Sequence, residues 1–160
     1  MIIGNSKLKF KDQSSKIKVQ RNRMSTFESS VKIVEYPQEK VYATLSDLSN
    51  LGKLEGKFPE DKFKDFEFSA DSVSINVQPV GKVAMNIVER EEPKCIKYEA
   101  TQSLIPFNLW VQLLPVTETT CKMKLTIKAD INPFIKGMVS GPLNEGLEKL
   151  AETLAHIQYE

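Results

Sequence analysis

The side chains best suited to chemistry are few in this sequence, and they stand far apart. His156 is the only histidine, and Cys95 and Cys121 are the only cysteines. Nucleophilic catalysis needs a nucleophile paired with a base, and a structural zinc site needs a cluster of about four ligands. Neither arrangement is visible. We therefore expect no catalytic residue, no metal and no cofactor, and two unpaired thiols of a reducing compartment.

Acid–base catalysis would need a titratable side chain inside a substrate site. The strand alternation described below places few polar residues on the inner face of the predicted sheet: Ser29, Tyr98 and Gln102, with Glu89 at a strand end. This scarcity favours a protein without catalytic activity. The alternative is a cyclase or hydratase that uses a carboxylate, a tyrosine with a water molecule, or a histidine.

The bulk composition is that of an ordinary globular domain. The chain has 160 residues, of which 41% are hydrophobic and 27% are charged, and these values fit one domain. No apolar run reaches the ~18–20 residues of a membrane span, and Met1–Gly4 does not supply the apolar core of a signal peptide. We expect a cytoplasmic protein with no stable membrane insertion.

Charge is distributed unevenly along the chain. Residues 1–23 carry seven lysines and arginines against one aspartate, whereas the rest has 15 basic and 20 acidic residues. The mildly acidic body argues against nucleic-acid binding. We interpret residues 1–23 as a disordered basic extension before a domain of residues 24–160. A tether to anionic lipid or RNA, or an extra edge strand, are the alternatives.

The first elements after residue 24 are a strand and two short helices. Residues 27–34 alternate between apolar and polar, which predicts a half-buried strand with Phe27, Val31 and Ile33 inward. Pro37 then opens a helix with Val41, Leu45 and Leu48 on one side. A second short helix carries Leu51 and Leu54, and a charged loop follows over residues 53–65.

Six further strands are predicted from period-two alternation and from the turns between them. They cover residues 66–68, 73–77, 83–87, 96–100, 107–114 and 121–129. Short connections make neighbouring strands antiparallel. Residues 107–114 are nearly all apolar, which predicts burial on both faces or contact with a partner.

The last stretch predicts one long helix. Asn132 is a suitable N-cap and Pro133 a suitable first helical residue. Apolar residues then recur at steps of three and four, and so form one stripe: Ile135, Val139, Leu143, Leu147, Leu150, Leu154 and Ile157. The predicted fold is therefore α+β, with a curved seven-stranded antiparallel sheet wrapped around this helix.

Such a fold should be hollow. Seven strands make a sheet roughly 30 Å wide, whereas one helix is only ~10 Å across. Gly137, Gly141, Gly146 and Pro142 weaken or kink the helix. They mark either a bend or a cap and restart over the sheet, or space for a guest molecule and a movable gate.

The order of elements resembles the START-like helix-grip superfamily, also called SRPBCC, which includes polyketide cyclase-type and lipid-transfer domains. The similar features are the first strand with Pro37 and two short helices, the meander from Phe66 to Asp130, and the Asn132-Pro133-Phe134 entry to the last helix. The resemblance covers residues 24–158. It implies the fold and, for most such proteins, binding or carriage of small apolar molecules.

We predict a cavity between the sheet and the kinked half of the helix, lined by residues of three kinds. Methionines adapt to irregular guests, a tyrosine hydroxyl can orient them, and small or inward apolar residues leave room. The predicted ligand-binding residues are Ser29, Phe68, Ile75, Met85, Tyr98, Trp110, Met123, Met138, Gly141 and Pro142.

Trp110 belongs to this set only if its strand has inverted parity, with Asn108 and Gln112 as polar contacts. The simple parity instead turns Trp110 outward, where an exposed tryptophan would mark a homodimer surface. The favoured function is non-catalytic binding of a small hydrophobic molecule such as a lipid, isoprenoid or polyketide. An interaction module that uses Trp110 or the basic extension is a further alternative.

Overall fold

The computed structural model describes residues 24–57, 61, 63–78 and 81–159. The predicted basic extension, residues 1–23, lies outside the described residues. None of the helices in the described part of the chain is both long enough and apolar enough to cross a membrane.

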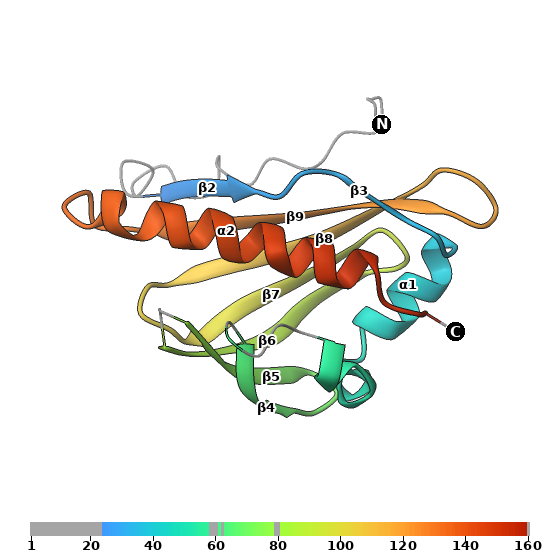
Figure 1. The fold of residues 1–160 in the computed structure, drawn as a ribbon, viewed down its shortest axis with the longest axis horizontal. Coiled ribbons are helices and arrows are strands. Elements are labelled where there is room, and N and C mark those ends of the chain that lie inside the picture. Colours follow the sequence, from blue (N-terminus) through green and yellow to red (C-terminus); the bar gives the residue numbers. More distant parts are fainter. Residues whose placement is uncertain (1–23, 58–60, 62, 79–80, 160) are drawn as a thin grey trace.

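The structure is a strongly curved antiparallel sheet with one long helix lying in its concave face (Figure 1). Neighbouring strands follow the order β2-β9-β8-β7-β6-β5-β4, and β3 pairs with β9 beyond the end of β2. Six strands in chain order therefore form the predicted meander. The strands are β2 (Met24–Glu28), β3 (Lys32–Val34), β4 (Phe63–Phe68), β5 (Ser72–Val77), β6 (Gly81–Glu91), β7 (Cys95–Gln102), β8 (Phe107–Pro115) and β9 (Cys121–Asp130).

Within the described residues the sheet has eight strands rather than seven, because the predicted first strand is interrupted. Glu28 pairs with Thr126 and Lys32 with Met123, so the β2–β3 segment contains one residue more than the stretch of β9 it faces. Ser29 fills the interruption: its backbone N–H donates to the Leu125 carbonyl, and its Oγ accepts from the Leu125 N–H, both at 2.9 Å.

This extra residue reverses the side-chain parity after it, because alternation has a period of two. Val31 and Ile33 are 52% and 53% exposed, whereas Val34 is fully buried. The predicted inward positions of Val31 and Ile33 were therefore wrong. Phe27, which precedes the interruption, is buried as predicted.

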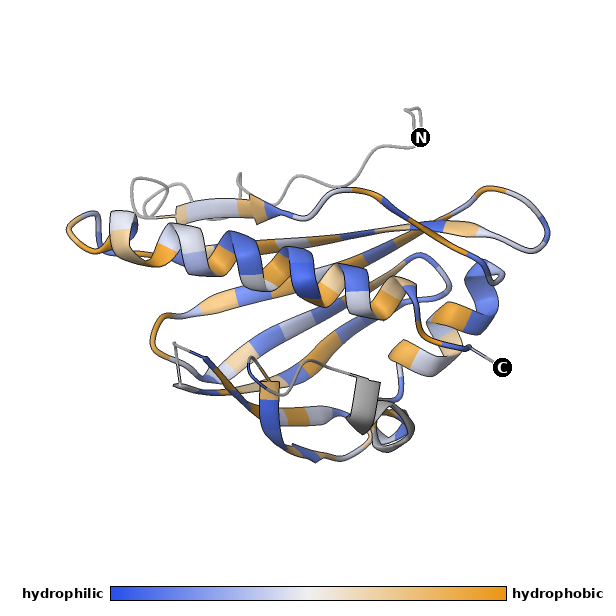
Figure 2. Ribbon diagram, viewed as in Figure 1, coloured by the Kyte–Doolittle hydropathy of each residue, from blue (hydrophilic) through white to orange (hydrophobic). Residues whose placement is uncertain are grey.

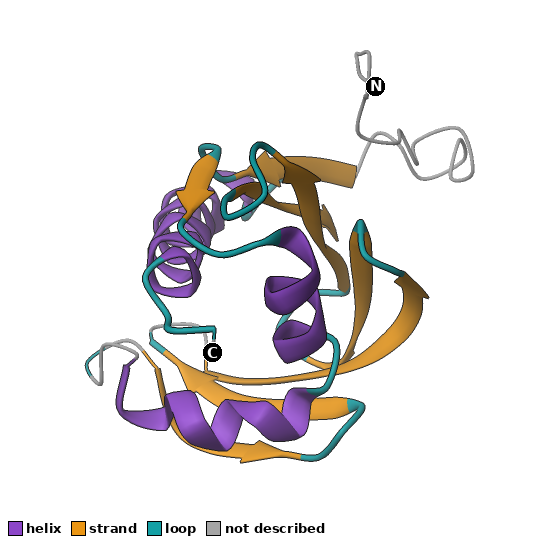
Figure 3. Ribbon diagram, turned by 90° about the vertical axis from the view of Figure 1, so that its right-hand side faces the viewer, coloured by secondary structure: helices purple, strands orange, loops and turns teal. Residues whose placement is uncertain are grey.

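The two short helices lie at one end of the molecule (Figure 3). The α-helix α1 (Gln38–Leu45) follows Pro37, and the 3-10 helix η2 (Leu48–Lys57) comes directly after it. Val41 and Leu45 are buried. Gln38 anchors α1 to the sheet, because its Nε2 donates to the Leu113 carbonyl at 3.0 Å.

The long helix α2 (Lys136–Ala155) is continuous through Pro142, so the cap-and-restart interpretation was wrong. It also begins later than predicted. Asn132 Oδ1 accepts from the Phe134 N–H at 2.9 Å, and a turn over residues 133–135 precedes the helix. The apolar stripe faces the sheet as predicted, with Leu147, Leu154 and Ile157 buried.

A charged contact fixes the middle of α2 to the interruption between β2 and β3. Glu148 accepts from the Ser30 backbone N–H at 2.9 Å and from the Ser30 hydroxyl. The Lys32 ammonium lies 2.6 Å from the same carboxylate. Hydrogen bonds from Lys32 and Ser30 lower the pKa of Glu148 to about 2.

Hydrophobic and hydrophilic residues alternate along the strands (Figure 2). The inner residues of β8 and β9 form a solid core with α1 and the carboxyl end of α2, where Leu113, Met123 and Leu125 are fully buried. Leu109 to Leu113 are all buried, as the apolar run of β8 predicted. Packing is therefore tight at this end of the molecule, and the space described next lies beside it.

Candidate ligand-binding cavity

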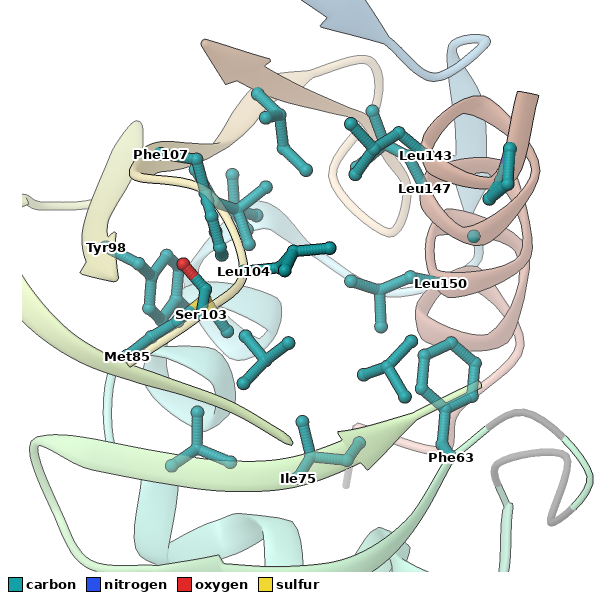
Figure 4. Close-up of a pocket in the computed structure, with 18 of the residues that line it drawn as sticks. Phe63, Ile75, Met85, Tyr98, Ser103, Leu104, Phe107, Leu143, Leu147 and Leu150 are labelled. Carbon is teal, nitrogen blue, oxygen red and sulfur yellow. The ribbon is translucent and has the colours of Figure 1, made fainter. Parts of the chain in front are cut away.

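A cavity of about 210 Å³ lies between α2 and the concave face of the sheet. Its walls come from every strand from β4 to β9, and Leu45, Leu48 and Leu51 of α1 and η2 close one end. Most of the lining is hydrocarbon, as Figure 4 shows. The apolar wall residues on the strands are Phe63, Phe66, Val73, Ile75, Val77, Val83, Met85, Phe107, Leu109, Val111 and Ile127.

The roof of the cavity is the apolar stripe of α2. Steps of three and four residues return to one face of a helix, so the stripe presents a continuous row of side chains to the sheet. The roof residues are Val139, Pro142, Leu143, Gly146, Leu147, Leu150 and Leu154. Gly146 has no atom within 4 Å of the position a Cβ would occupy, so the helix leaves room there.

Three lining residues are exposed and mark the mouth. They are Gln78 after β5, Leu104 in the β7–β8 loop and Glu145 on α2. Leu104 is 67% exposed although it also lines the cavity, and in Figure 4 it extends from its loop toward α2. The mouth therefore lies between this loop and the amino-terminal half of α2.

Tyr98 and Ser103 are the polar side chains of the wall inside the mouth. The Tyr98 hydroxyl donates to the Leu45 carbonyl at 3.1 Å, and Tyr98 is only 5% exposed. Burial raises the pKa of this phenol far above its usual range. Ser103 Oγ donates to the Ile105 carbonyl within its own loop.

The arrangement offers little to acid–base chemistry. Within the described part of the lining, Tyr98 and Glu145 are the only titratable side chains. His156 is exposed at the end of α2, with its Nδ1 2.8 Å from the Glu152 carbonyl oxygen. Within the described residues, no three His, Cys, Asp or Glu side chains gather as metal ligands. Cys95 is half-buried and Cys121 is buried, and the two thiols are not joined in a disulfide.

Four of the residues predicted to bind a ligand do line the cavity. Ile75, Met85 and Tyr98 are in its walls, and Pro142 is in its roof. The structure thus brings together residues from three strands and the helix. Their contact with a ligand stays a prediction.

Six predicted residues do not line the cavity, and helix phase or packing explains each. Met138 is 75% exposed and Gly141 is also exposed, because they lie outside the stripe that faces the sheet. Met123 is fully buried in the solid core. Ser29 fills the strand interruption, and Phe68 lies 3.3 Å from the position of a Gly52 Cβ, against η2.

Trp110 is the sixth of these residues, and it points to the other face of the sheet. Its neighbours Leu109 and Val111 line the cavity, so the simple parity was right and the inverted parity was wrong. Trp110 is nevertheless only 8% exposed, and the Lys97 ammonium lies 5.3 Å from its ring centroid. The exposed aromatic surface expected for a dimer is therefore absent at Trp110.

Sequence reasoning missed the β7–β8 loop as part of the site. Ser103, Leu104 and Ile105 all line the cavity, although this segment was interpreted only as a chain break. The adjacent apolar pair Leu104-Ile105 in a turn was the available signal, because a turn usually carries polar residues. Phe63 was missed because β4 begins before the predicted strand.

Comparison by sequence gives no relative for this chain. No protein-family model matches it, and no curated protein matches it.

Comparison by structure gives clear similarities at low sequence identity. Norcoclaurine synthase from Thalictrum flavum, in complex with dopamine and hydroxybenzaldehyde, has a TM-score of 0.66 at 12% identity, covering 88% of this chain and 93% of that one. A START superfamily protein from Mycobacterium smegmatis has a TM-score of 0.63 at 14% identity, covering 82% and 94%. A conserved protein from Geobacillus kaustophilus has a TM-score of 0.58 at 14% identity, covering 82% and 93%. The chain therefore has the START-like helix-grip fold that its order of elements predicted.

Proposed function

We propose that this protein binds or carries a small hydrophobic molecule, such as a lipid, isoprenoid or polyketide, in the cavity between the sheet and α2. The observation that carries the proposal is an apolar space of about 210 Å³ beside a core of buried side chains. Leaving apolar walls unfilled is unfavourable, because they lose the contacts that a packed core would make. This supports a use for the space.

The composition of the lining supports a hydrophobic ligand. Binding sites for small molecules are mostly apolar, with a few placed polar groups. Here the polar groups of the inner wall are Tyr98 and Ser103. A cavity of this size is also below the ~300–1,000 Å³ of typical drug-sized sites, so a compact ligand is expected.

An enzyme of the cyclase or hydratase type is the second candidate. It is favoured by the similarity in fold to norcoclaurine synthase. The lining argues against it, because general acid–base catalysis needs a titratable group within reach of the substrate. Tyr98 has its proton committed to a backbone carbonyl and a raised pKa, while Glu145 stands exposed at the mouth.

The proposal is tested with two glycines of α2 that differ in their position. A Cβ at either Gly141 or Gly146 would meet no atom within 4 Å, but only Gly146 lines the cavity. Gly146→Phe places a ring in the space, whereas Gly141→Phe places the same ring on the exposed side. Binding of the fluorescent apolar probe N-phenylnaphthylamine is measured for both variants and for the wild type.

We expect probe fluorescence to rise with the wild type and with Gly141→Phe, and to stay near the buffer level with Gly146→Phe. Native mass spectrometry of the purified wild type should also show a bound small molecule that Gly146→Phe lacks. Equal probe binding by both variants would contradict a ligand site in this cavity. Conversion of the bound molecule to a product would favour the enzyme instead.

A further inference from the structure

The hydrogen bonds inside the cavity restrict the chemical class of its ligand. Among the described residues, two polar side chains belong to the inner wall, Tyr98 and Ser103. A hydroxyl has one proton to donate and oxygen lone pairs that accept. The direction in which each hydroxyl already donates therefore decides what it can offer to a guest molecule.

The Tyr98 proton is committed to the end of a helix. Leu45 is the last residue of α1, and the last carbonyls of a helix have no partner within the helix. The Tyr98 hydroxyl satisfies the Leu45 carbonyl at 3.1 Å. Both residues that this hydrogen bond joins line the cavity. If the Tyr98 hydroxyl turned its proton away from the Leu45 carbonyl, that carbonyl would lose its hydrogen-bond partner, which is costly for a buried group.

The Ser103 proton is committed in the same way. Its Oγ donates to the Ile105 carbonyl two residues later, within the β7–β8 loop. Both hydroxyls of the inner wall therefore present lone pairs, and neither has a proton left for a ligand. Burial also raises the pKa of Tyr98, so the phenol keeps its proton, and its bond to Leu45, at neutral pH.

The charges around the cavity also disfavour an anionic ligand. Among the described residues that line it there is no lysine, arginine or histidine, whereas the carboxylate of Glu145 stands at its mouth. A carboxylate or phosphate deep in the cavity would lose its hydration and meet the oxygen lone pairs of Tyr98 and Ser103, because the amide of Gln78 stands at the mouth. Buried charges of this kind are expensive unless they are paired.

We propose that the ligand is an apolar molecule with a hydrogen-bond donor, a neutral alcohol, phenol or amine, whose O–H or N–H donates to the Tyr98 hydroxyl oxygen. This inference rests on the proposed function and makes Tyr98 the residue that determines specificity. It excludes free fatty acids and other anionic lipids as preferred ligands. It also separates this cavity from one that selects by shape alone.

The test compares three ligands of one shape that differ only at the polar end. Para-pentylphenol carries a donor, para-pentylanisole carries a methyl ether with no donor, and para-pentylbenzoate carries an anion. Dissociation constants are measured by calorimetry at pH 7 for the wild type and for Tyr98→Phe. Tyr42→Phe is the matched control, because Tyr42 is a buried tyrosine of α1 that does not line the cavity.

We expect the wild type and Tyr42→Phe to prefer the phenol over the anisole more strongly than Tyr98→Phe does, by about five- to tenfold, as one hydrogen bond would give. The benzoate should bind most weakly to all three proteins. Retained binding of the anisole by Tyr98→Phe would show that the cavity of this variant is intact. If the variant no longer binds the anisole, the inference is decided by the wild type alone, which should bind the phenol more tightly than the anisole and the benzoate.

Two results would overturn the inference while leaving the proposed function in place. One is the same preference for phenol in the wild type and in Tyr98→Phe. The other is benzoate binding as tight as that of phenol. A wild type that binds none of the three ligands would overturn the proposed function itself.

Discussion

The carboxylate of Glu148 has an unusual number of partners for a residue on the surface of a helix. Its two oxygens receive the Ser30 N–H, the Ser30 hydroxyl and the Lys32 ammonium. The strand interruption at Ser29 makes this possible, because it turns residue 30 and the Lys32 side chain toward α2. One inserted residue thus both reverses the parity of β3 and creates the attachment point for the helix.

This contact predicts a specific pH dependence of stability. The folded pKa of Glu148 is lowered from 4.5 to about 2, so its contribution is present above about pH 4.5 and is lost as the pH falls toward 2. The side chain is 42% exposed, and solvent screening limits the contribution to about 0.5–1 kcal/mol. Glu148→Gln should therefore unfold at lower urea concentration than the wild type at pH 6.

At pH 2.5 the two proteins should differ much less, because the wild-type carboxylate is then partly protonated. Glu152→Gln, an exposed change on the same helix, serves as the control and should follow the wild type at both pH values. An equal difference between Glu148→Gln and the wild type at pH 6 and pH 2.5 would contradict the role of the charge.

At the scale of elements, α2 combines a strong apolar stripe with residues that weaken helices. Gly141 and Pro142 lie in its interior, yet the helix is continuous from Lys136 to Ala155. Packing of the stripe on the sheet outweighs the local preference, as tertiary contacts often do. Gly146 and Pro142 face the cavity, whereas Gly141 does not. Substitutions at Gly146 and Pro142 would therefore change the cavity, and a substitution at Gly141 would not.

Gly137→Ala should stabilise the protein. The glycine is exposed in the first turn of α2, and an added Cβ would meet no atom within 4 Å beyond its own helix and chain neighbours, so the helix gains up to about 0.5–1 kcal/mol. The melting temperature should rise by roughly 1–4 °C. Gly81→Ala is the control with the opposite sign, because Gly81 has φ +95°, where a Cβ is strained. A fall in the melting temperature of Gly137→Ala would contradict this expectation.

Periodicity predicted the elements well but their phase less well. The stripe from Val139 to Leu154 and the meander followed directly from spacing, because burial imposes those periods. The parity of Val31 and Ile33 failed, since an inserted residue leaves the alternation of types unchanged while it reverses the faces. The predicted inward position of Met138 was wrong for a related reason. Met138 lies next to Val139 of the apolar stripe, but its own side chain lies outside the face that meets the sheet.

At the scale of the whole molecule, the sheet is wider than one helix can fill. That mismatch could be predicted from strand number and helix diameter. The cavity does lie between α2 and the sheet, but it extends along the helix from Val139 to Leu154 instead of staying beside Met138 and Gly141 as predicted. Its lining could be predicted only in part. Ser103 and Leu104 belong to a loop whose path depends on three-dimensional packing, and Met123 lies where α1 and the end of α2 already fill the sheet.

The central claim is that this interior is an apolar space open to a guest molecule. The most direct measurement is X-ray diffraction from crystals held under xenon pressure, because xenon enters dry apolar cavities and is visible in electron density. We expect xenon among Ile75, Leu147 and Leu150, and none at the same position in Gly146→Phe. Continuous side-chain density there in the wild type, with no xenon, would contradict the account.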